Sequence, residues 1–286
     1  MINKKTKTCF LNSPYSSTKH DSYFDTYDEL FSKYVGQDIT FVEIGVLNGG
    51  SLFMWRDYFG QKARIIGIDN NSNAKYWEKY GFEIFIGNQS DKNFWQSFKD
   101  SVGKVDILLD DGGHIDYQQT VTLFENINSI NENGLIVIED VHSSYMKEFG
   151  NPSKFSFTNL VSKLIDRINY RSTHLNKNFN FLKLPICEIR VFESIYAFRI
   201  NSEQSNISKQ IINDGKFLGF KDLRNSNTSI SNAQNLIKKI LFLKNIPILG
   251  NMLKNIYNKF IRDKLYLLYL KREKKKFMRK YFKWLI

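Results

Sequence analysis

Residues 105–114, VDILLDDGGH, organise the chain, because a hydrophobic run passes directly into two aspartates, two glycines and a histidine. A second stretch of this kind, residues 135–140, reads LIVIED. Apolar runs of this length, rich in Ile, Leu and Val, are typical of buried parallel strands. Open α/β sheets bind their ligands in the loops at the carboxyl ends of such strands. The side chains expected to meet at that edge are Asp110, Asp111, His114, Glu139 and Asp140.

Patterns of helices and strands alternate around these two stretches. Short connections join them, which predicts an α/β fold with a doubly wound, mostly parallel, Rossmann-like sheet. The strands are expected at residues 39–45, 64–69, 82–86, 105–110 and 135–138. Two later apolar runs, 186–192 and 195–200, are separated by only two residues. A parallel crossover needs a dozen or more residues, so these runs predict a closing antiparallel hairpin.

A short helix is expected before the sheet. Aromatic residues recur at roughly helical spacing after Asp21, among them Tyr23, Tyr27 and Tyr34. This pattern predicts a short helix that leads into the sheet.

Charge divides the chain unevenly. The net charge is +12, but residues 1–200 have a balance of −2 and residues 201–286 a balance of +14. Between them, 12 of the 33 residues of 201–233 are Asn or Ser, which is typical of loops and linkers. The chain is therefore expected to consist of a domain at 1–200, a polar linker at 201–233 and a basic amphipathic helical extension at 234–286.

Several classes of protein are not indicated by the composition. No run approaches the roughly 18 apolar residues of a membrane span, and the basic N-terminus lacks the apolar region of a signal peptide. A cytoplasmic location is therefore expected. The two cysteines, Cys9 and Cys187, have no ligand-spaced neighbour, so they indicate ordinary packing and neither a zinc site nor a disulfide framework.

A glycine-rich loop follows the first expected strand. Residues 43–51, EIGVLNGGS, do not form the dinucleotide fingerprint, because Leu47 stands where that motif needs glycine. The loop resembles the cofactor loop of class I S-adenosylmethionine methyltransferases, and Asp69 at the end of the second strand matches the acidic residue that binds ribose in that family. Carboxylates and carbonyl groups also suit a cationic sulfonium better than a phosphate-binding loop would.

That resemblance implies contacts to S-adenosylmethionine along three successive strand ends. The loop would approach the methionine part of the cofactor, and residues 87–91 after the third strand would lie near its adenine. The implied cofactor-binding residues are Glu43, Gly45, Asn48, Gly49, Ser51, Asp69, Gln89, Ser90, Asp91 and Asp110.

The acidic cluster extends the resemblance. DDGGH followed by EDVH resembles the metal-dependent sugar O-methyltransferases that tailor macrolide and tetracenomycin glycosides, within a wider family found in surface-polysaccharide gene sets. The resemblance covers about residues 15–200 and matches Thr-Asp-Lys of the family only loosely at 17–19. It implies that Asp111, Glu139 and Asp140 hold Mg²⁺ and that His114 is the general base, with Asp111 and His114 as the catalytic residues.

Elementary chemistry is consistent with these roles. Magnesium takes six oxygen ligands, so three carboxylates leave about three positions, enough for two neighbouring hydroxyl groups and a water. Coordination lowers the pKa of a hydroxyl, and a histidine can then accept its proton near neutral pH. Asp110 has the alternative role of supporting its loop.

The other candidates in this region keep two interpretations each. His142 either orients a metal ligand or packs, and Tyr117 and Tyr145 either border the substrate or are partly buried aromatic residues. His20 and His174 carry no functional signal.

The expected acceptor is a sugar of a bacterial capsule or O-antigen, or its nucleotide-activated form, because the chain is rich in Lys, Asn and Ile and has four Ala, as in AT-rich genomes. One alternative is an O-methyltransferase of catechols or small phenols. The other is a non-catalytic protein that docks through its basic tail. That tail would pack on the domain or on a second subunit, or lie on an anionic membrane at its inner face. Nucleic acid is the least favoured partner.

Overall fold

The computed structural model describes residues 5–172, 184–206, 209–216 and 218–220, together with seven residues between 268 and 279. The chain divides into two compact units, Met1–Ile211 and Ile212–Ile286. Most of the predicted extension at 234–286 lies outside the described residues, so the domain boundaries at 200 and 233 stay predictions. Seven residues of the extension are described, and all are helical and exposed: Leu268, Lys271, Arg272, Lys274, Lys275, Met278 and Arg279.

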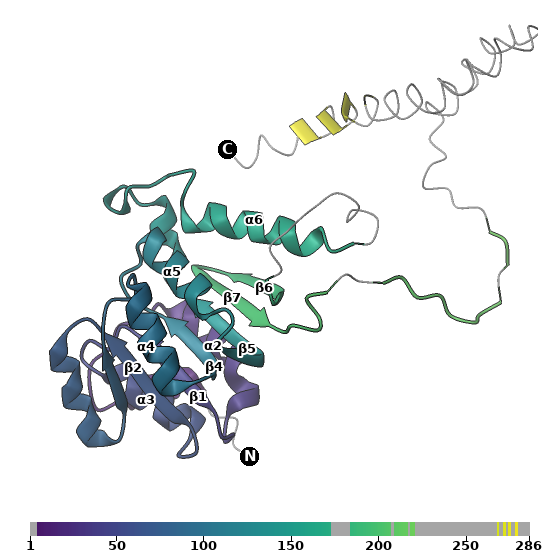
Figure 1. The fold of residues 1–286 in the computed structure, drawn as a ribbon. Coiled ribbons are helices and arrows are strands. Elements are labelled where there is room, and N and C mark those ends of the chain that lie inside the picture. The colour runs from purple at the N-terminus through teal and green to yellow at the C-terminus, as the bar shows by residue number, and fades with distance from the viewer. Residues whose placement is uncertain are drawn as a thin grey trace, which may run out of the picture. The chain divides into compact units, whose positions relative to one another are not determined.

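A seven-stranded sheet forms the centre of the first unit (Figure 1). Its spatial order is β3-β2-β1-β4-β5-β7-β6, with β7 antiparallel to both of its neighbours and the other pairs parallel. This confirms the predicted Rossmann-like sheet and its closing hairpin. The strands are β1 (Thr40–Ile44), β2 (Arg64–Asp69), β3 (Glu83–Ile86), β4 (Val105–Asp110), β5 (Ile130–Ile138), β6 (Ile186–Phe192) and β7 (Ile195–Ile200).

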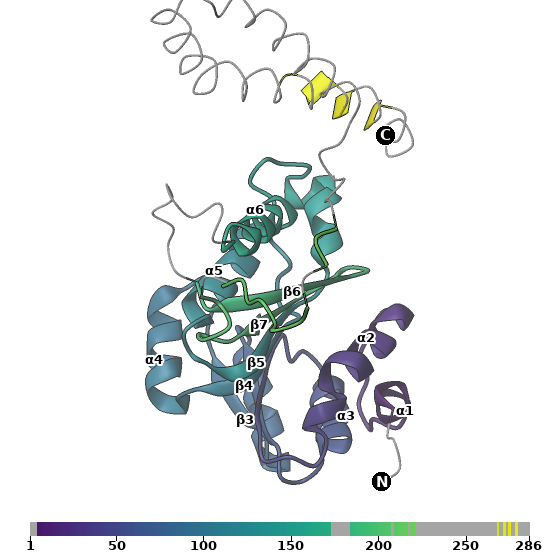
Figure 2. The same ribbon diagram turned by 90° about the vertical axis from the view of Figure 1, so that its right-hand side faces the viewer.

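Helices cover both faces of the sheet (Figure 2). One face carries α1 (Thr6–Leu11), α2 (Asp21–Phe31), α3 (Gly50–Phe59) and the 3₁₀ segments η1 (Ser32–Tyr34) and η2 (Ser72–Tyr80). The other carries α4 (Lys92–Val102), α5 (Asp116–Asn126) and α6 (Phe157–Asn169). The 3₁₀ segments η3 (Val141–Tyr145) and η4 (Lys147–Phe149) follow β5.

The strand sequences explain this two-sided cover. Successive side chains of a strand point to opposite faces, and in β4 Ile107 and Leu109 join the core beneath α2 and α3, whereas Leu108 joins the core beneath α4 and α5. A strand with both faces buried must be apolar throughout, which is why these stretches are continuous hydrophobic runs.

The register places the ends of three strands at one level. Ile44 of β1 pairs with Asp110 of β4, which pairs in turn with Ile138 of β5. The loops after these strands therefore begin side by side at the carboxyl edge of the sheet. At the edge of β5, the Val141 N–H donates to the carbonyl oxygen of Ser194 at 3.1 Å, which brings the turn of the β6–β7 hairpin to the same place.

No helix within the described part of the chain has the length and apolar character that crossing a membrane requires.

Candidate functional site

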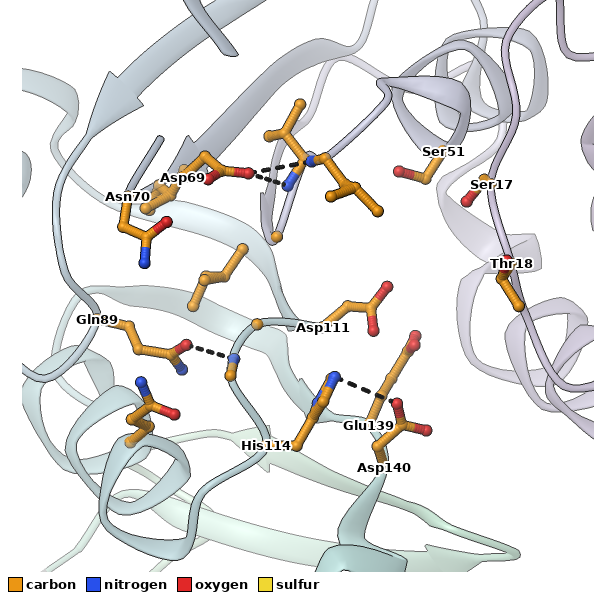
Figure 3. Close-up of a pocket in the computed structure, with 18 of the residues that line it drawn as sticks. Ser17, Thr18, Ser51, Asp69, Asn70, Gln89, Asp111, His114, Glu139 and Asp140 are labelled. Atoms are coloured by element: carbon orange, nitrogen blue, oxygen red, sulfur yellow. Dashed lines mark hydrogen bonds and ion pairs between the residues drawn. The ribbon is translucent and has the colours of Figure 1, made fainter. Parts of the chain in front are cut away.

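A cavity of about 530 Å³ opens at the carboxyl edge of the sheet (Figure 3). The loops after β1 to β5 form its floor and two of its sides, and residues 16–20 with Tyr23 form a further wall. One side is formed by the glycine-rich loop, Asp69 and Gln89, and the other by the acidic residues (Figure 3). We call these the cofactor side and the acidic centre, the latter comprising Asp111, His114, Glu139 and Asp140.

Backbone conformation shapes the loop of the cofactor side. Gly45 has φ of +91°, and a Cβ there would lie 2.1 Å from the carbonyl oxygen of Asp111. Only glycine permits this approach. The N–H groups of Val46 and Leu47 both donate to Asp69 Oδ2 at 3.0 Å. The Asp69 carboxylate therefore ties the loop after β1 to the end of β2.

Gln89 links the cofactor side to the loop after β4. Its Nε2 donates to both carboxylate oxygens of Asp110, at 3.0 and 2.9 Å, and its Oε1 accepts from the Gly113 N–H at 2.9 Å. Burial raises the pKa of Asp110, while Thr122 and Gln89 oppose that rise. Asp110 also accepts from the Gly112 N–H at 3.1 Å, so its carboxylate holds the glycine turn from below.

Half of the predicted cofactor residues line the cavity, namely Gly45, Asn48, Ser51, Asp69 and Gln89. The other half are not among the lining residues, namely Glu43, Gly49, Ser90, Asp91 and Asp110. A sequence pattern identifies a loop but not which of its side chains point inward. Direct cofactor contact by the second group therefore stays a prediction.

Two of the predicted cofactor residues outside the lining, Glu43 and Asp91, have hydrogen-bond partners within the protein. Glu43 is fully buried and accepts hydrogen bonds from Ser51 Oγ at 2.7 Å and Trp55 Nε1 at 3.0 Å. Burial raises the pKa of Glu43 to about 7, although nearby Lys19 opposes the rise. Asp91 caps α4 by accepting from the Asn93 N–H at 2.8 Å, and this agrees with the expected helix start.

The acidic centre brings together residues from two loops. His114 Nε2 lies 3.4 Å from Asp140 Oδ2, and Asp111, His114 and Asp140 each place a ligand atom within 4.8 Å of the others. His114 and Asp140 both have positive φ, at +55° and +53°, a backbone conformation that is uncommon for residues other than glycine. His114 Nδ1 is buried and has no hydrogen-bond partner among the described residues.

Lys19 enters this centre from the N-terminal segment, within the stretch 17–19 that only loosely matched the family's Thr-Asp-Lys and was not counted among the site residues. Its ammonium lies 2.6 Å from Asp111 Oδ2, 2.9 Å from Glu139 Oε2 and 3.9 Å from Glu43 Oε1, and its side chain is 1% exposed. Burial alone would lower the pKa of Lys19, but the carboxylates of Asp111 and Glu139 raise it well above its usual value. Three carboxylates therefore surround one buried cation.

Two tyrosines of α2 complete the contacts. The Tyr27 hydroxyl donates to Glu139 Oε1, and the Tyr23 hydroxyl donates to Asp140 Oδ1. Burial raises the pKa of Glu139 to about 8 against the opposing effect of Lys19. Burial and the neighbouring Glu139 raise the pKa of Tyr27 well above its usual value, so its hydroxyl remains a donor.

Two further histidines lie beside the acidic centre. His20, for which the sequence carries no functional signal, lines the cavity. His142 Nδ1 hydrogen-bonds Ser194 Oγ of the hairpin and lies 3.9 Å from Asp140 Oδ1, which is too far for a hydrogen bond, so both interpretations of His142 stay open. Tyr117 and Tyr145, for which bordering the substrate was one of two interpretations, are exposed and are not among the lining residues. His174 is outside the described residues.

The donor set fits a hard divalent cation. The side chains of Asp111 and Asp140 offer carboxylate oxygens, which Mg²⁺ prefers as ligands. The predicted third ligand, Glu139, is not part of this group, because its two oxygens pair with Tyr27 and Lys19. His114 is close enough to join this set or to receive a proton from a group bound in the cavity.

Comparison with known proteins shows partial relatives. No family model matches the chain. It is 32% identical over 136 residues to the 8-demethyl-8-α-L-rhamnosyl tetracenomycin-C 2′-O-methyltransferase of Streptomyces olivaceus, covering 45% of this chain and 35% of that protein. It is 28% identical over 183 residues to the mycinamicin VI 2″-O-methyltransferase of Micromonospora griseorubida, covering 59% and 45%. The chain thus spans less than half the length of these two relatives.

A solved structure shares the fold. The mycinamycin pathway methyltransferase MycE, solved with Mg and S-adenosylhomocysteine, matches with a TM-score of 0.61 and 24% identity, over 73% of this chain and 57% of that one. The chain therefore has the Rossmann-like fold of that methyltransferase. Its sequence is similar to sugar O-methyltransferases, as the motifs indicated.

Proposed function

We propose that this chain is an S-adenosylmethionine-dependent O-methyltransferase that uses Mg²⁺ and methylates a sugar hydroxyl. The observation that carries the proposal is the division of one cavity into two chemically different sides. The glycine-rich loop with Asp69 forms one side, and Asp111, His114 and Asp140 converge on the other. A methyl donor and a metal-bound hydroxyl need such neighbouring sites.

The cofactor side suits an uncharged ribose and a cationic sulfonium. Asp69 offers a carboxylate at the end of β2, where the related fold binds the ribose hydroxyls. Asn48, Ser51 and Gln89 add neutral polar groups. A phosphate would instead meet the Asp69 carboxylate, which repels an anion.

The acidic centre suits deprotonation of a hydroxyl. Asp111, Glu139 and Asp140 would hold Mg²⁺, and the ion when bound supplies a Lewis acid that lowers the acceptor hydroxyl's pKa. His114 lines the same cavity, where its imidazole accepts the acceptor's proton as general base. The close packing of Gly45 against Asp111 keeps the two sides adjacent, which favours the alignment that methyl transfer requires.

The finer identity of the acceptor rests on composition. The named relatives act on rhamnosyl tetracenomycin-C and mycinamicin VI, which are glycosides. The chain has only four Ala and is rich in Lys, Asn and Ile, as in proteins of AT-rich genomes. We take this composition to favour a surface-polysaccharide sugar of the capsule or O-antigen type, or its nucleotide-activated precursor, as the acceptor. Self-association and contact with an anionic membrane through the basic extension are further proposals, while nucleic acid is the partner least favoured.

A methyl-transfer screen tests the proposal. Purified full-length protein is incubated with labelled S-adenosylmethionine and with nucleotide-sugars, glycosylated macrolides or catechols, each with Mg²⁺ and with EDTA. We expect Mg²⁺-dependent label transfer to nucleotide-sugars and none with the Asp111→Asn variant. Transfer to catechols alone would contradict the sugar assignment. Failure of S-adenosylhomocysteine to raise the melting temperature would instead favour a non-catalytic binding protein.

A further inference from the structure

Three residues of the N-terminal segment reach the acidic centre from one side. Lys19, Tyr23 and Tyr27 are spaced by four residues, and we call them the N-terminal stripe. Residues four apart lie on the same face of a helix, so Tyr23 and Tyr27 of α2 point in one direction. Lys19 lies just before the helix begins and continues that line.

Each member of the stripe meets a different part of the centre. Lys19 joins Asp111 Oδ2 and Glu139 Oε2, at 2.6 and 2.9 Å. Tyr27 donates to the other oxygen of Glu139, and Tyr23 donates to Asp140 Oδ1. The carboxylates of Asp111, Glu139 and Asp140 therefore each receive at least one hydrogen bond from this single segment.

The charge of Lys19 matters because the surroundings are dry. Glu139 and Glu43 are fully buried, and a buried carboxylate without a partner is strongly unfavourable. Within the described residues, Lys19 is the only Lys or Arg that forms an ion pair with Asp111, Glu139 or Glu43. Without this ammonium, the pKa values of Glu43 and Glu139 would rise further, and the two groups would be less readily ionised.

The two tyrosines carry no charge and act by fixing the orientation of the carboxylates to which they donate hydrogen bonds. Tyr23 occupies one oxygen of Asp140, while the other oxygen lies 3.4 Å from His114 Nε2. A carboxylate held in this way cannot rotate freely. Removing a hydrogen-bond partner of a metal ligand typically lowers the affinity for the metal by about 10- to 100-fold.

We propose that the N-terminal stripe positions the acidic centre for a divalent cation. Lys19 supplies the positive charge that keeps Asp111 and Glu139 together before an ion binds, and Tyr23 and Tyr27 orient Asp140 and Glu139. The inference rests on the proposed function, because it concerns the same metal ligands. It makes Lys19, Tyr23 and Tyr27 positioning residues, because each acts through a carboxylate.

The charge role of Lys19 and the orienting role of Tyr23 predict opposite effects of substitution on the response to Mn²⁺. In Tyr23→Phe only a hydroxyl is lost, so we expect Mn²⁺ affinity to fall by about 10- to 100-fold while the fold is kept. In Lys19→Met a cation is lost, so a bound ion should compensate for it. We therefore expect saturating Mn²⁺ to raise the melting temperature of Lys19→Met more than that of the wild type.

Tyr34→Phe is the matched control for the hydroxyl deletion. Its hydroxyl donates to the Asn133 carbonyl oxygen at 3.1 Å and belongs to η1, the segment that directly follows α2. Tyr34 is not among the residues that line the cavity. We expect this variant to bind Mn²⁺ as the wild type does.

The experiment is a calorimetric Mn²⁺ titration of the four full-length proteins, with melting temperatures measured in chelator and in saturating Mn²⁺. S-Adenosylhomocysteine affinity is measured in parallel and should not differ between Tyr23→Phe and the wild type. Equal Mn²⁺ affinity in wild type, Tyr23→Phe and Tyr34→Phe would overturn the inference alone. Absence of Mn²⁺ binding by the wild type would overturn the proposed metal use and this inference together. If Lys19→Met does not fold, the comparison of Tyr23→Phe with Tyr34→Phe decides.

Discussion

The two sides of the cavity are built in different ways. The cofactor side is made largely of backbone and short polar side chains from successive strand ends, and Asp69 ties its loop through two N–H groups. The acidic centre instead draws charged side chains from distant parts of the chain, with Lys19 separated from Asp111 by 92 positions and from Glu139 by 120. A local sequence motif can specify the first side, whereas only the folded chain assembles the second.

This difference predicts that substitutions on the two sides have separable effects. The largest is expected for Asp111→Asn, which removes a charged ligand from the acidic centre. Loss of the metal's contribution, worth several kcal/mol, should lower turnover by about 10³-fold or more. Steady-state methyl-transfer rates with and without EDTA measure this effect. Unchanged S-adenosylhomocysteine affinity confirms that the cofactor side is intact, and full activity in EDTA would contradict the metal assignment.

His114→Ala should have the next largest effect. Loss of a general base should lower kcat by about 10²-fold while leaving KM for the cofactor near its wild-type value. The rate is measured across pH, because chemical catalysis by hydroxide should partly restore the variant at high pH. An unchanged kcat would transfer the role of base to another group.

Asp69→Ala should act on the other side. The variant leaves the N–H groups of Val46 and Leu47 without their acceptor, and hydrogen bonds to a charged group contribute about 1.5–3 kcal/mol each. We expect S-adenosylhomocysteine affinity to fall by tenfold or more and Mn²⁺ affinity to stay the same, as calorimetry would show. Asp69→Asn, which keeps an acceptor, should lose less. A matching loss of Mn²⁺ affinity would show that the two sides are not separable.

The smallest effect concerns Glu43, which lies beneath both sides. Burial raises the pKa of Glu43 from 4.5 to about 7, so the folded protein holds a proton that the unfolded chain releases. This stabilisation is complete below pH 4.5 and is lost as pH rises through 7, at up to about 1.4 kcal/mol per pH unit. Glu43→Gln should therefore flatten the decline of unfolding free energy between pH 5 and 7, measured by urea denaturation. A slope equal to that of the wild type would contradict the assignment.

The fold could be predicted from sequence because its signals are local. Residues 64–69 and 105–110 are strands at their predicted bounds, and the first strand at Thr40–Ile44 differs from expectation by one residue at each end. Continuous apolar runs bounded by polar turns determine such strands whatever the rest of the chain does. The two-residue separation of the last runs likewise left the antiparallel hairpin as the predicted connection.

The acidic centre could be predicted only in part. Strand ends revealed Asp111, His114, Glu139 and Asp140, but nothing local to Lys19 indicates that it enters a cluster of carboxylates. The helical spacing of Tyr23 and Tyr27 was interpreted as that of a lead-in helix, and in the structure their rings pack on the core. The same spacing also carries their hydroxyls to Glu139 and Asp140, and hydrophobic periodicity does not detect the polar end of an amphipathic side chain.

Gly45 sets a limit on how this site can be changed. At this point the backbone of the loop after β1 lies directly against the backbone of Asp111 in the loop after β4. A methyl group at position 45 would force the loops after β1 and β4 apart, and so separate the cofactor side from Asp111. Attempts to fit a bulkier acceptor should therefore leave position 45 alone and alter the N-terminal wall of the cavity, which includes Ser17 and Thr18.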